Sequence, residues 1–371
     1  MTEYRKLGLG EPAPYFRQRN TSNPAYAFDT VAGRYIVMCF FGTAGDELGL
    51  AALSITNTHR RLFDDERVSF FGVSFDAEDE RASRVKESLP GIRHFWDADG
   101  TIGRLYGALP VSADTPQQAA RRLWVVLDPG LHVIAFIPMS PDGRDRAELI
   151  ELLTKLPPVS HYGGIEMHAP VIIQPNVFEP SLCRHLIDAY ERHGGEVSGF
   201  MREVDGKTVG VYDNHHKTRN DFNIEDEQLK QLLQRRVQQK VIPMIRKVYC
   251  YQATRMERYI VGCYDSENSG HFTAHRDNTT KGTAHRRCAL SVNLNQDFEG
   301  GELSFPEYGP RTYKVPAGSA VIFSGALLHA VSPVRKGRRY AFLPFLYDEA
   351  AAALREKNNP HLAPSVGEYK S

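Results

Sequence analysis

Two histidines and an aspartate in the C-terminal half of the chain are of the residue types that bind transition metals. His275 and Asp277 form a His-x-Asp pair, and His329 follows farther along the chain. Side chains two positions apart on a β-strand point to the same side, so the pair can face one ion. Two imidazoles and one carboxylate form the facial triad of non-haem Fe(II) sites, which leaves positions on the metal open for small ligands. This pattern predicts an iron site with His275, Asp277 and His329 as its ligands.

Short β-strands are predicted around these ligands, because short runs of alternating or apolar residues end at Gly or Pro. The runs lie at residues 287–294, 302–306, 311–315 and 319–323. Several short strands at this spacing favour a sandwich or a jelly roll. We expect His275 and His329 to lie on neighbouring strands. We also expect a hairpin at 329–347 to carry Arg339 back past His329.

An arginine follows the last predicted ligand on the same hairpin. Arg339 shares one face of its strand with Leu343 and Phe345, whereas Arg338 points to the other side and is expected to be solvated. A guanidinium that lies among apolar neighbours and close to a metal site needs a carboxylate partner. Arg339 is therefore a candidate anchor for a carboxylate ligand.

These residues belong to a series of motifs that run in order along the chain. The motifs are CY at 263–264, GxFxxHxDN at 270–278, GGEL at 300–303, HxVxP at 329–333 and GxRY at 337–340. The series resembles the prolyl 4-hydroxylase branch of the Fe(II)/2-oxoglutarate dioxygenases. The resemblance covers about residues 168–348, and the segment at 175–190 is similar to the first helix of that family.

The resemblance implies a cosubstrate site beside the metal. Fe(II) would be held by the three ligands named above, and Arg339 would pair with the distal carboxylate of 2-oxoglutarate. Tyr264 falls where related hydroxylases place a tyrosine that hydrogen-bonds the cosubstrate. Asn293 falls where some members have another polar or aromatic contact to it.

The resemblance also implies a reaction. Dioxygen and 2-oxoglutarate would yield succinate and CO2 while an unactivated C–H is hydroxylated. A prolyl or other amino-acid or peptidyl substrate is the nearest analogue, a small metabolite is another, and L-ascorbate is a further cofactor that the family suggests. The related radical halogenases lack the carboxylate ligand to leave room for halide, so Asp277 favours hydroxylation.

The first 160 residues alternate apolar strands with helices, which indicates an α/β domain. The predicted strands are 35–41, 68–73, 123–127 and 132–137, and the predicted helices are 49–63, 78–88 and 146–156. This half resembles the thioredoxin fold in its peroxiredoxin form, through GEPAPYF at 10–16, WDADGTIGRLYGAL at 96–109 and RRLWVVLDPGLHV at 121–133.

The N-terminal half lacks the cysteine on which peroxiredoxin chemistry depends. That thiol lies in the first turn of a helix, where the helix N-terminus lowers its pKa. The segment 42–50 contains no cysteine, and the corresponding position is near Gly49. Cys39 lies inside an apolar strand and is expected to be a buried structural thiol. We therefore predict a non-catalytic thioredoxin-like domain at 1–160, which leaves dimerisation, substrate presentation or partner binding as its roles.

The predicted fold class is a thioredoxin-like α/β domain followed by a double-stranded β-helix, or jelly roll, with flanking helices. The dioxygenase domain is expected at 161–371, after a linker rich in Pro, Gly and Ser at 155–169. Residues 194–222 read as a loop or hairpin. Within it, the polar tract 214–221 is expected to be a loop that lines the substrate entrance.

Composition excludes several classes of partner. Lys plus Arg and Asp plus Glu number 45 each, so the balance gives no support for a nucleic-acid or membrane-surface partner. No run approaches the roughly 20 apolar residues of a membrane span. The N-terminal segment lacks the apolar core of a secretory signal. Five cysteines without a C-x-x-C pair favour reduced thiols and a cytoplasmic protein.

Other functions remain as alternatives to a hydroxylase. A non-enzymatic iron, oxygen or redox sensor that acts through the thioredoxin-like domain would bind iron without turnover. A peroxidase is opposed by the absence of cysteine near Gly49, and nucleic-acid demethylation by the neutral charge balance.

Overall fold

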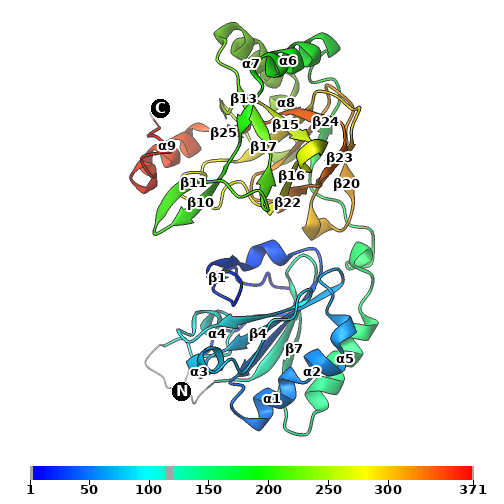
Figure 1. Cartoon of the computed structure of the whole chain (residues 1–371), viewed down its shortest axis with the longest axis vertical. Coiled ribbons are helices and arrows are strands. Elements are labelled where there is room, and N and C mark those ends of the chain that lie inside the picture. The colour runs from blue at the N-terminus through cyan, green and yellow to red at the C-terminus, as the bar shows by residue number, and fades with distance from the viewer. Residues whose placement is uncertain (1–2, 113–119, 370–371) are drawn as a thin grey trace. The chain divides into compact units, whose positions relative to one another are not determined.

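The computed structural model describes residues 3–112 and 120–369. The chain divides into two compact units, of which the first comprises 1–168 with the short excursion 306–310, and the second 169–305 with 311–371. The division after His168 falls inside the linker predicted at 155–169, a few residues beyond the predicted boundary at 160. Each unit has its own sheets and its own core (Figure 1).

The first unit is built on a five-stranded sheet with the order β5-β4-β3-β6-β7. Strands β3, β4 and β5 are parallel, whereas β6 runs antiparallel to β3 and forms a hairpin with β7. Both β3 and β4 are buried along their whole length, which is why their sequences are continuously apolar. The strands are β3 Tyr35–Gly42, β4 Val68–Ser74, β5 Ile92–Trp96, β6 Leu123–Leu127 and β7 Val133–Pro138. The helices are α1 Glu47–Leu53, α2 Ile55–Thr58, α3 Ala77–Arg81, α4 Thr101–Leu105 and α5 Arg144–Lys155.

Two predicted helices of this unit are shorter than the sequence suggested. The helix expected at 49–63 is divided into α1, α2 and a 3-10 turn at Arg60–Leu62. Hydroxyl groups of Ser54 and Thr56 in this stretch donate to backbone carbonyls, which competes with regular helix formation. The helix expected at 78–88 ends at Arg81, and Ser83 then adopts a positive φ of 50°.

A carboxylate occupies the first turn of α1. The Asp46 side chain accepts a hydrogen bond from the Gly49 amide at 2.9 Å, and Arg122 donates to the same carboxylate at 2.7 Å. A Cβ atom at Gly49 would lie 1.8 Å from the Thr43 carbonyl oxygen, so no side chain fits at this position. Cys39 is fully buried in β3, and burial raises the pKa of its thiol well above the usual value. The N-terminus of α1 therefore carries the ion pair of Asp46 with Arg122 where a peroxiredoxin would have its reactive thiol.

A buried histidine makes the stability of the first unit sensitive to acid. His94 on β5 is 3% exposed, and burial lowers its pKa to about 4. An unfolded chain takes up this proton near pH 6.5, so the unfolded state binds more protons between about pH 6.5 and 4. We expect the contribution of His94 to the free energy of unfolding to fall as the pH falls through this window, by up to about 3 kcal/mol. Asp97 contributes in the opposite direction, because burial raises the pKa of its carboxyl to about 7 and the folded state then binds the extra proton.

Tryptophan fluorescence isolates this effect, because the two tryptophans of the chain, Trp96 and Trp124, both lie in the first unit. Urea unfolding of the full chain is measured between pH 7 and pH 4. The free energy of unfolding of the wild type relative to His94→Gln is expected to fall as the pH falls, whereas the exposed control His59→Gln should follow the wild type. An equally steep dependence in His94→Gln would assign the effect to other groups.

The second unit is mainly β, with helices on one side, and is consistent with the predicted jelly roll. Its smaller sheet has the order β12-β16-β22-β19-β20. These strands are β12 Lys217–Thr218, β16 His271–His275, β22 His329–Val331, β19 Leu303–Ser304 and β20 Thr312–Tyr313. Its larger sheet has the order β14-β25-β17-β24-β15-β13-β9; in addition, β21 pairs with β17, and β8 pairs with β21. These strands are β14 Arg255–Glu257, β25 Phe345–Tyr347, β17 Cys288–Asn293, β24 Arg338–Phe342, β15 Ile260–Asp265, β13 Asn220–Asn223, β9 Glu196–Val197, β21 Ala320–Ser324 and β8 Ile172–Gln174.

Three helices cover the larger sheet. Helices α6 Pro180–His193, α7 Glu227–Lys240 and α8 Ile242–Tyr249 share one apolar core with its strands, formed by residues such as Leu186, Leu233, Ile245, Leu290 and Phe342. The chain between α7 and α8 is interrupted at Val241, two residues before Pro243. Helix α9 Glu349–Lys357 follows the last strand.

The strand pairing corrects one prediction about Arg339. Strand β24 does not form a hairpin with β22; it pairs with β15 and β17 of the larger sheet, whereas β22 pairs with β16 and β19. The intervening strand β23 Val334–Lys336 pairs with β18 Glu299–Gly300, and Gly337 then turns the chain with a φ of 72°. Arg339 therefore approaches from the opposite sheet and not from the neighbouring strand of His329.

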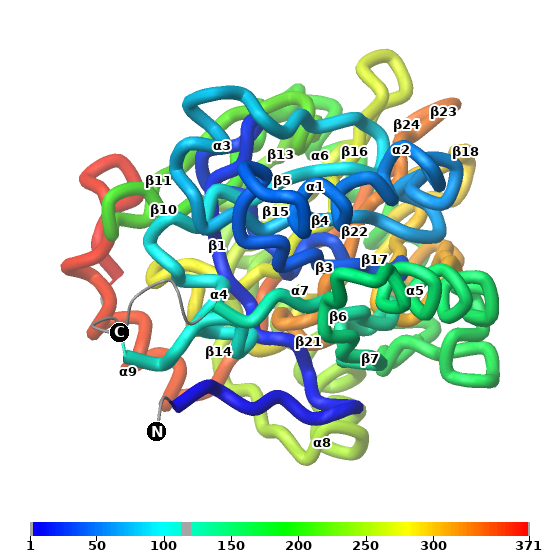
Figure 2. The backbone as a smooth tube through the Cα atoms, turned by 90° about the horizontal axis from the view of Figure 1, so that it is seen from below, coloured from blue at the N-terminus to red at the C-terminus, as the bar shows by residue number. Residues whose placement is uncertain are grey.

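Residues 194–222 contain the predicted hairpin. Strands β10 Phe200–Val204 and β11 Lys207–Val211 are joined at Asp205 and Gly206, both with positive φ. The hairpin stands out from its unit in both views, and its β11 end lies against the C-terminal segment, where Lys207 donates to the Pro360 carbonyl (Figures 1 and 2).

None of the helices in the described ranges combines the length and apolar character that crossing a bilayer requires.

Candidate metal centre

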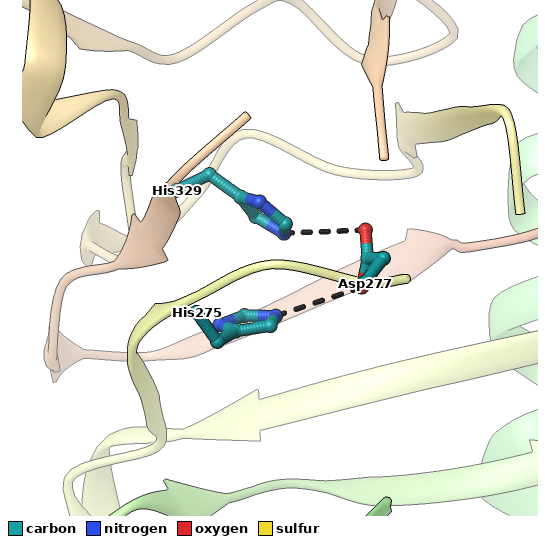
Figure 3. Close-up of side chains that lie close together, drawn as sticks. All are labelled: His275, Asp277 and His329. Carbon is teal, nitrogen blue, oxygen red and sulfur yellow. Dashed lines mark ion pairs between the residues drawn. The ribbon is translucent and has the colours of Figure 1, made fainter. Parts of the chain in front are cut away.

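The two predicted histidine ligands lie directly opposite each other on adjacent strands. His275 on β16 pairs with His329 on β22, and Asp277 follows immediately after β16. The Asp277 backbone amide donates to the Gly325 carbonyl at 2.9 Å, which holds the carboxylate beside the two rings. Figure 3 shows both imidazoles directed at the Asp277 carboxylate.

The donor atoms converge. His275 Nε2 lies 3.7 Å from Asp277 Oδ1, and His329 Nε2 lies 3.5 Å from Asp277 Oδ2 (Figure 3). Each ring nitrogen Nδ1 is hydrogen-bonded to a backbone carbonyl, at 2.7 Å for Thr273 and 2.9 Å for Leu327. A carbonyl only accepts, so Nδ1 carries the proton and Nε2 presents its lone pair. Hydrogen bonds of this kind from Nδ1 to a carbonyl hold the rings of metal-binding histidines in a fixed orientation.

The electrostatics of the cluster fit a divalent cation. Burial and the neighbouring His329 keep the pKa of His275 well below its usual value, so its imidazole is neutral. Asp277 Oδ2 is buried and has no hydrogen-bond donor among the described residues. A carboxylate oxygen left in this way is costly unless a cation satisfies it. His275, Asp277 and His329 each offer one ligand atom, and these atoms lie within 4.8 Å of one another. Among the described residues, this is the group that can hold a metal ion. The set of two nitrogens and one oxygen fits Fe(II).

Arg339 lies across the barrel from the triad and is buried, with 3% of its surface exposed. Its Nη2 donates to Ser291 Oγ at 2.9 Å and to Asn293 Oδ1 at 3.1 Å. Its Nη1 is buried and has no acceptor among the described residues. Burial lowers the pKa of this guanidinium, and no carboxylate of the described chain forms an ion pair with it. A carboxylate of a bound ligand would supply the missing acceptor.

The other two predicted cosubstrate residues lie beside Arg339. Tyr264 pairs with Arg339 across β15 and β24, and its ring centroid is 5.4 Å from the guanidinium carbon. Asn293 donates through Nδ2 to the Val315 carbonyl at 2.8 Å and accepts from Arg339 through Oδ1. Both polar atoms of the Asn293 amide therefore have partners within the protein, and Asn293 positions the Arg339 guanidinium.

Three charged residues of the site were missed by sequence reasoning. The tract 214–221 read as a polar loop, whereas Lys217, Arg219 and Asp221 are buried on or between β12 and β13. Arg219 forms an ion pair with Asp221 at 2.6 Å and donates to the Tyr264 hydroxyl at 3.2 Å. Their spacing of two residues was the available signal, because it places all three on one face of a strand.

His216 is close to the metal centre without belonging to the triad. Its ring lies 4.3 Å from that of Phe200 and 5.4 Å from that of Phe272, and 6.3 Å from that of His275. His216 thus packs between the rings of Phe200 and Phe272.

Comparison with known proteins places this site in a family. Residues 259–347, which hold all three triad residues, Tyr264, Asn293 and Arg339, match the 2OG-Fe(II) oxygenase superfamily. A PKHD-type hydroxylase of Pseudomonas fluorescens is 40% identical over 91 residues, which are 22% of this chain and 39% of the relative. A PKHD-type hydroxylase of Synechococcus sp. is 26% identical over 121 residues, which are 30% of this chain and 53% of the relative. The chain thus spans from about two fifths to about half of the length of these relatives.

Solved structures of prolyl hydroxylases are also similar. A Pseudomonas putida prolyl-4-hydroxylase superposes with a TM-score of 0.38 and 17% identity, over 49% of this chain and 94% of the other. A Trichoplax adhaerens prolyl hydroxylase gives a TM-score of 0.40 and 18% identity, over 56% of this chain and 95% of the other. The assignment rests on the family match and on the site, and not on these superpositions. The chain carries a 2OG-Fe(II) oxygenase domain, similar to that of the PKHD-type hydroxylases.

Proposed function

We propose that the protein is an Fe(II)- and 2-oxoglutarate-dependent dioxygenase that hydroxylates an unactivated C–H of an amino-acid, peptidyl or related substrate. The observation that carries this proposal is the buried Arg339 guanidinium in the barrel that holds the triad. Among the described residues its Nη1 donor has no acceptor, and the guanidinium has no carboxylate partner. A metal site alone would fit many functions. A metal site with a separate buried carboxylate anchor fits a cosubstrate with two acidic ends.

The residues of the site have distinct roles in this proposal. His275, Asp277 and His329 would hold Fe(II), and the bound metal with 2-oxoglutarate would supply the oxidation that converts O2 and the cosubstrate into succinate, CO2 and a hydroxyl group on the substrate. The Nδ1 bonds to backbone carbonyls fix both imidazoles. Asp277 fills a ligand position that a halogenase leaves open for halide, which favours hydroxylation.

The cosubstrate is held by the larger sheet. Arg339 would receive the distal carboxylate, with Ser291 and Asn293 fixing the plane of its guanidinium. Tyr264 accepts a hydrogen bond from Arg219, so its own hydroxyl proton is free to donate to the cosubstrate. Aromatic rings shield the metal side: Phe272 stacks on His275 at 3.5 Å, and Phe323 lies 4.7 Å from His329.

The substrate class follows from the relatives. The names of the similar proteins, PKHD-type hydroxylase and prolyl-4-hydroxylase, support a prolyl or related amino-acid substrate. We propose that turnover benefits from L-ascorbate, as the resemblance to prolyl hydroxylases suggests.

We further propose that the first unit is a thioredoxin-like domain without peroxidase activity. The order of its sheet, with parallel β3 and β4 beside the antiparallel hairpin β6–β7, supports the fold. The ion pair of Asp46 with Arg122 at the start of α1 supports the lack of thiol chemistry. Its role would then be in dimerisation, substrate presentation or partner binding.

Anaerobic titration with 2-oxoglutarate tests the proposed site. We expect the Fe(II)-loaded protein to develop a weak charge-transfer band in the green as the cosubstrate chelates the metal. The band should be absent in His329→Ala, because the site loses one of its two imidazoles. Iron binding without the band in the wild-type protein would instead favour an iron or redox sensor.

A further inference from the structure

A buried lysine lies on the metal side of the barrel. Lys217 on β12 pairs with Phe272 on β16, the strand that carries His275. Cross-strand partners point to the same face of a sheet. Its Nζ lies 5.1 Å from the centroid of the Phe272 ring, and that ring stacks on His275 with centroids 3.5 Å apart and planes 18° apart. The Phe272 ring therefore contacts both the amino group of Lys217 and the imidazole of the metal ligand His275.

The hydrogen bonds of Lys217 do not include a carboxylate. The residue is 4% exposed, and its Nζ donates to Ser198 Oγ and to the Gly199 carbonyl, each at 2.6 Å. Both acceptors are uncharged. An ammonium has three donors, so one N–H is left for another acceptor. Lysine is almost never fully buried unless its charge is paired.

The surroundings of Lys217 hold more positive than negative charge. Arg219 and Arg258 both form ion pairs with Asp221, which is the carboxylate that links this group in the described part of the chain. Three cations thus share one anion. Burial, together with these two arginines, lowers the pKa of Lys217 to about 5. The ammonium form of Lys217 is therefore disfavoured in the free protein, and the carboxylate of an acidic ligand beside its Nζ would stabilise that form.

This position differs from the cosubstrate anchor. Arg339 lies on the larger sheet next to Tyr264, whereas Lys217 lies on the edge strand of the smaller sheet, beside the strand that carries His275. Arg219 contacts Tyr264, at 5.6 Å from the ring, and donates to Ser198 Oγ as Lys217 does, so it links the two positions. In the part of the chain that the structure describes, Lys217 and Arg339 are therefore two separate buried basic groups without a carboxylate partner.

We propose that Lys217 binds a carboxylate of the hydroxylated substrate, so that the enzyme acts on carboxylic acids such as free amino or imino acids or the C-terminal residue of a peptide. This inference rests on the proposed dioxygenase function and narrows its substrate class. An internal residue of a polypeptide has no carboxylate on its backbone and would leave the Lys217 charge without a partner.

A substrate panel tests the proposal on the full-length protein. The panel contains the twenty standard L-amino acids, their amides, and dipeptides ending in each residue as acid and as amide. Succinate formation is measured for each. We expect at least one acid to stimulate succinate release at least about tenfold more than its amide, because a charge-assisted hydrogen bond is lost in the amide. Stimulation by free amino acids or by dipeptide acids identifies which source of the carboxylate is used.

Variants then connect the acid preference to Lys217. Lys217→Met should weaken calorimetric binding of the stimulating acid to the anaerobic Fe(II)–2-oxoglutarate protein by about 10- to 100-fold. Lys217→Arg should keep part of the affinity, and Lys336→Met, an exposed lysine of the same unit, should keep all of it. The 2-oxoglutarate charge-transfer band should persist in every variant, which also shows that each variant folds.

Three results would overturn the proposal. They are equal stimulation by acids and amides, unchanged acid binding in Lys217→Met, and the absence of stimulation by every acid of the panel. The failure of the dioxygenase function itself would look different, since the wild-type protein would then lack the charge-transfer band before any substrate is added.

Discussion

Replacing Asp277 with alanine is expected to abolish 2-oxoglutarate turnover and to weaken Fe(II) binding more than about 100-fold. The reason is that this carboxylate is the anionic member of the triad, and even outer-shell partners of metal ligands contribute about 10- to 100-fold to affinity. Its removal also leaves the two imidazoles as the remaining ligands, whose Nε2 atoms lie 3.7 Å and 3.5 Å from the lost oxygens. Succinate release and equilibrium dialysis of Fe(II) measure the two effects.

A matched variant separates this effect from general damage. Asp297 is an exposed aspartate of the same unit, and Asp297→Ala should retain both iron affinity and turnover. Asp277→Asn keeps the shape of the side chain while it removes the charge, so it should lose most of the iron affinity as well. Full turnover in Asp277→Ala would show that the metal ligands lie elsewhere.

Replacing Arg339 with alanine should raise the 2-oxoglutarate concentration needed for half-maximal turnover by about 10- to 150-fold. A hydrogen bond to a charged group contributes about 1.5–3 kcal/mol, and about 1.4 kcal/mol corresponds to a factor of ten. The Fe(II) affinity should change little, because Arg339 lies on the other sheet and touches none of the three ligands. Titration of the charge-transfer band with 2-oxoglutarate measures the affinity directly.

The neighbouring arginine provides the control. Arg338 is 44% exposed on its side chain and pairs with Asp265 at 2.6 Å, so Arg338→Ala should leave 2-oxoglutarate affinity unchanged. Arg339→Lys should recover only part of the affinity, because an ammonium cannot make a bidentate contact. If Arg339→Ala binds 2-oxoglutarate normally, the anchor is another cation, and the buried Arg219 beside Tyr264 becomes the first candidate.

The metal site was the part of the structure most accessible from the sequence. Their spacing of two residues predicted that His275 and Asp277 face one ion. The structure brings the two side chains together, although β16 ends at His275 and Asp277 lies in the turn that follows. The position of His329 opposite His275 was expected from the order of short strands, and the structure has this pairing. The route of Arg339 was predicted wrongly, because adjacency along the chain suggested a hairpin, whereas β24 pairs with strands from distant parts of the sequence.

The charged tract near residue 217 shows a different limit. Lys217, Arg219 and Asp221 look like a solvated loop, since such residues are mostly exposed. Their burial depends on partners far away in sequence, such as Tyr264 and Arg258. Sequence periodicity shows which side chains share a face, but it does not show whether that face is covered.

The helices of the first unit were limited by local chemistry. The stretch after α1 contains Ser54, Thr56 and Thr58, whose hydroxyls bond to carbonyls three or four residues earlier. A period of apolar residues continues through this stretch, which is why one long helix was predicted. The backbone follows the competing hydrogen bonds instead.

The pairing of β16 with β22 contains a register shift between Phe272 and His275. The two strands therefore have unequal numbers of residues over the same stretch of the sheet. Three steps from Phe272 to His275 face two steps from Val331 to His329, so a ring and a ligand that would otherwise alternate share one side. The number of residues in this stretch, and not their types, therefore decides which side of the sheet the preceding residues of β16 face. These residues include Phe272, the strand partner of Lys217. Substitution at 273 or 274 preserves this count. The loss or gain of a single residue there inverts one half of the site relative to the other.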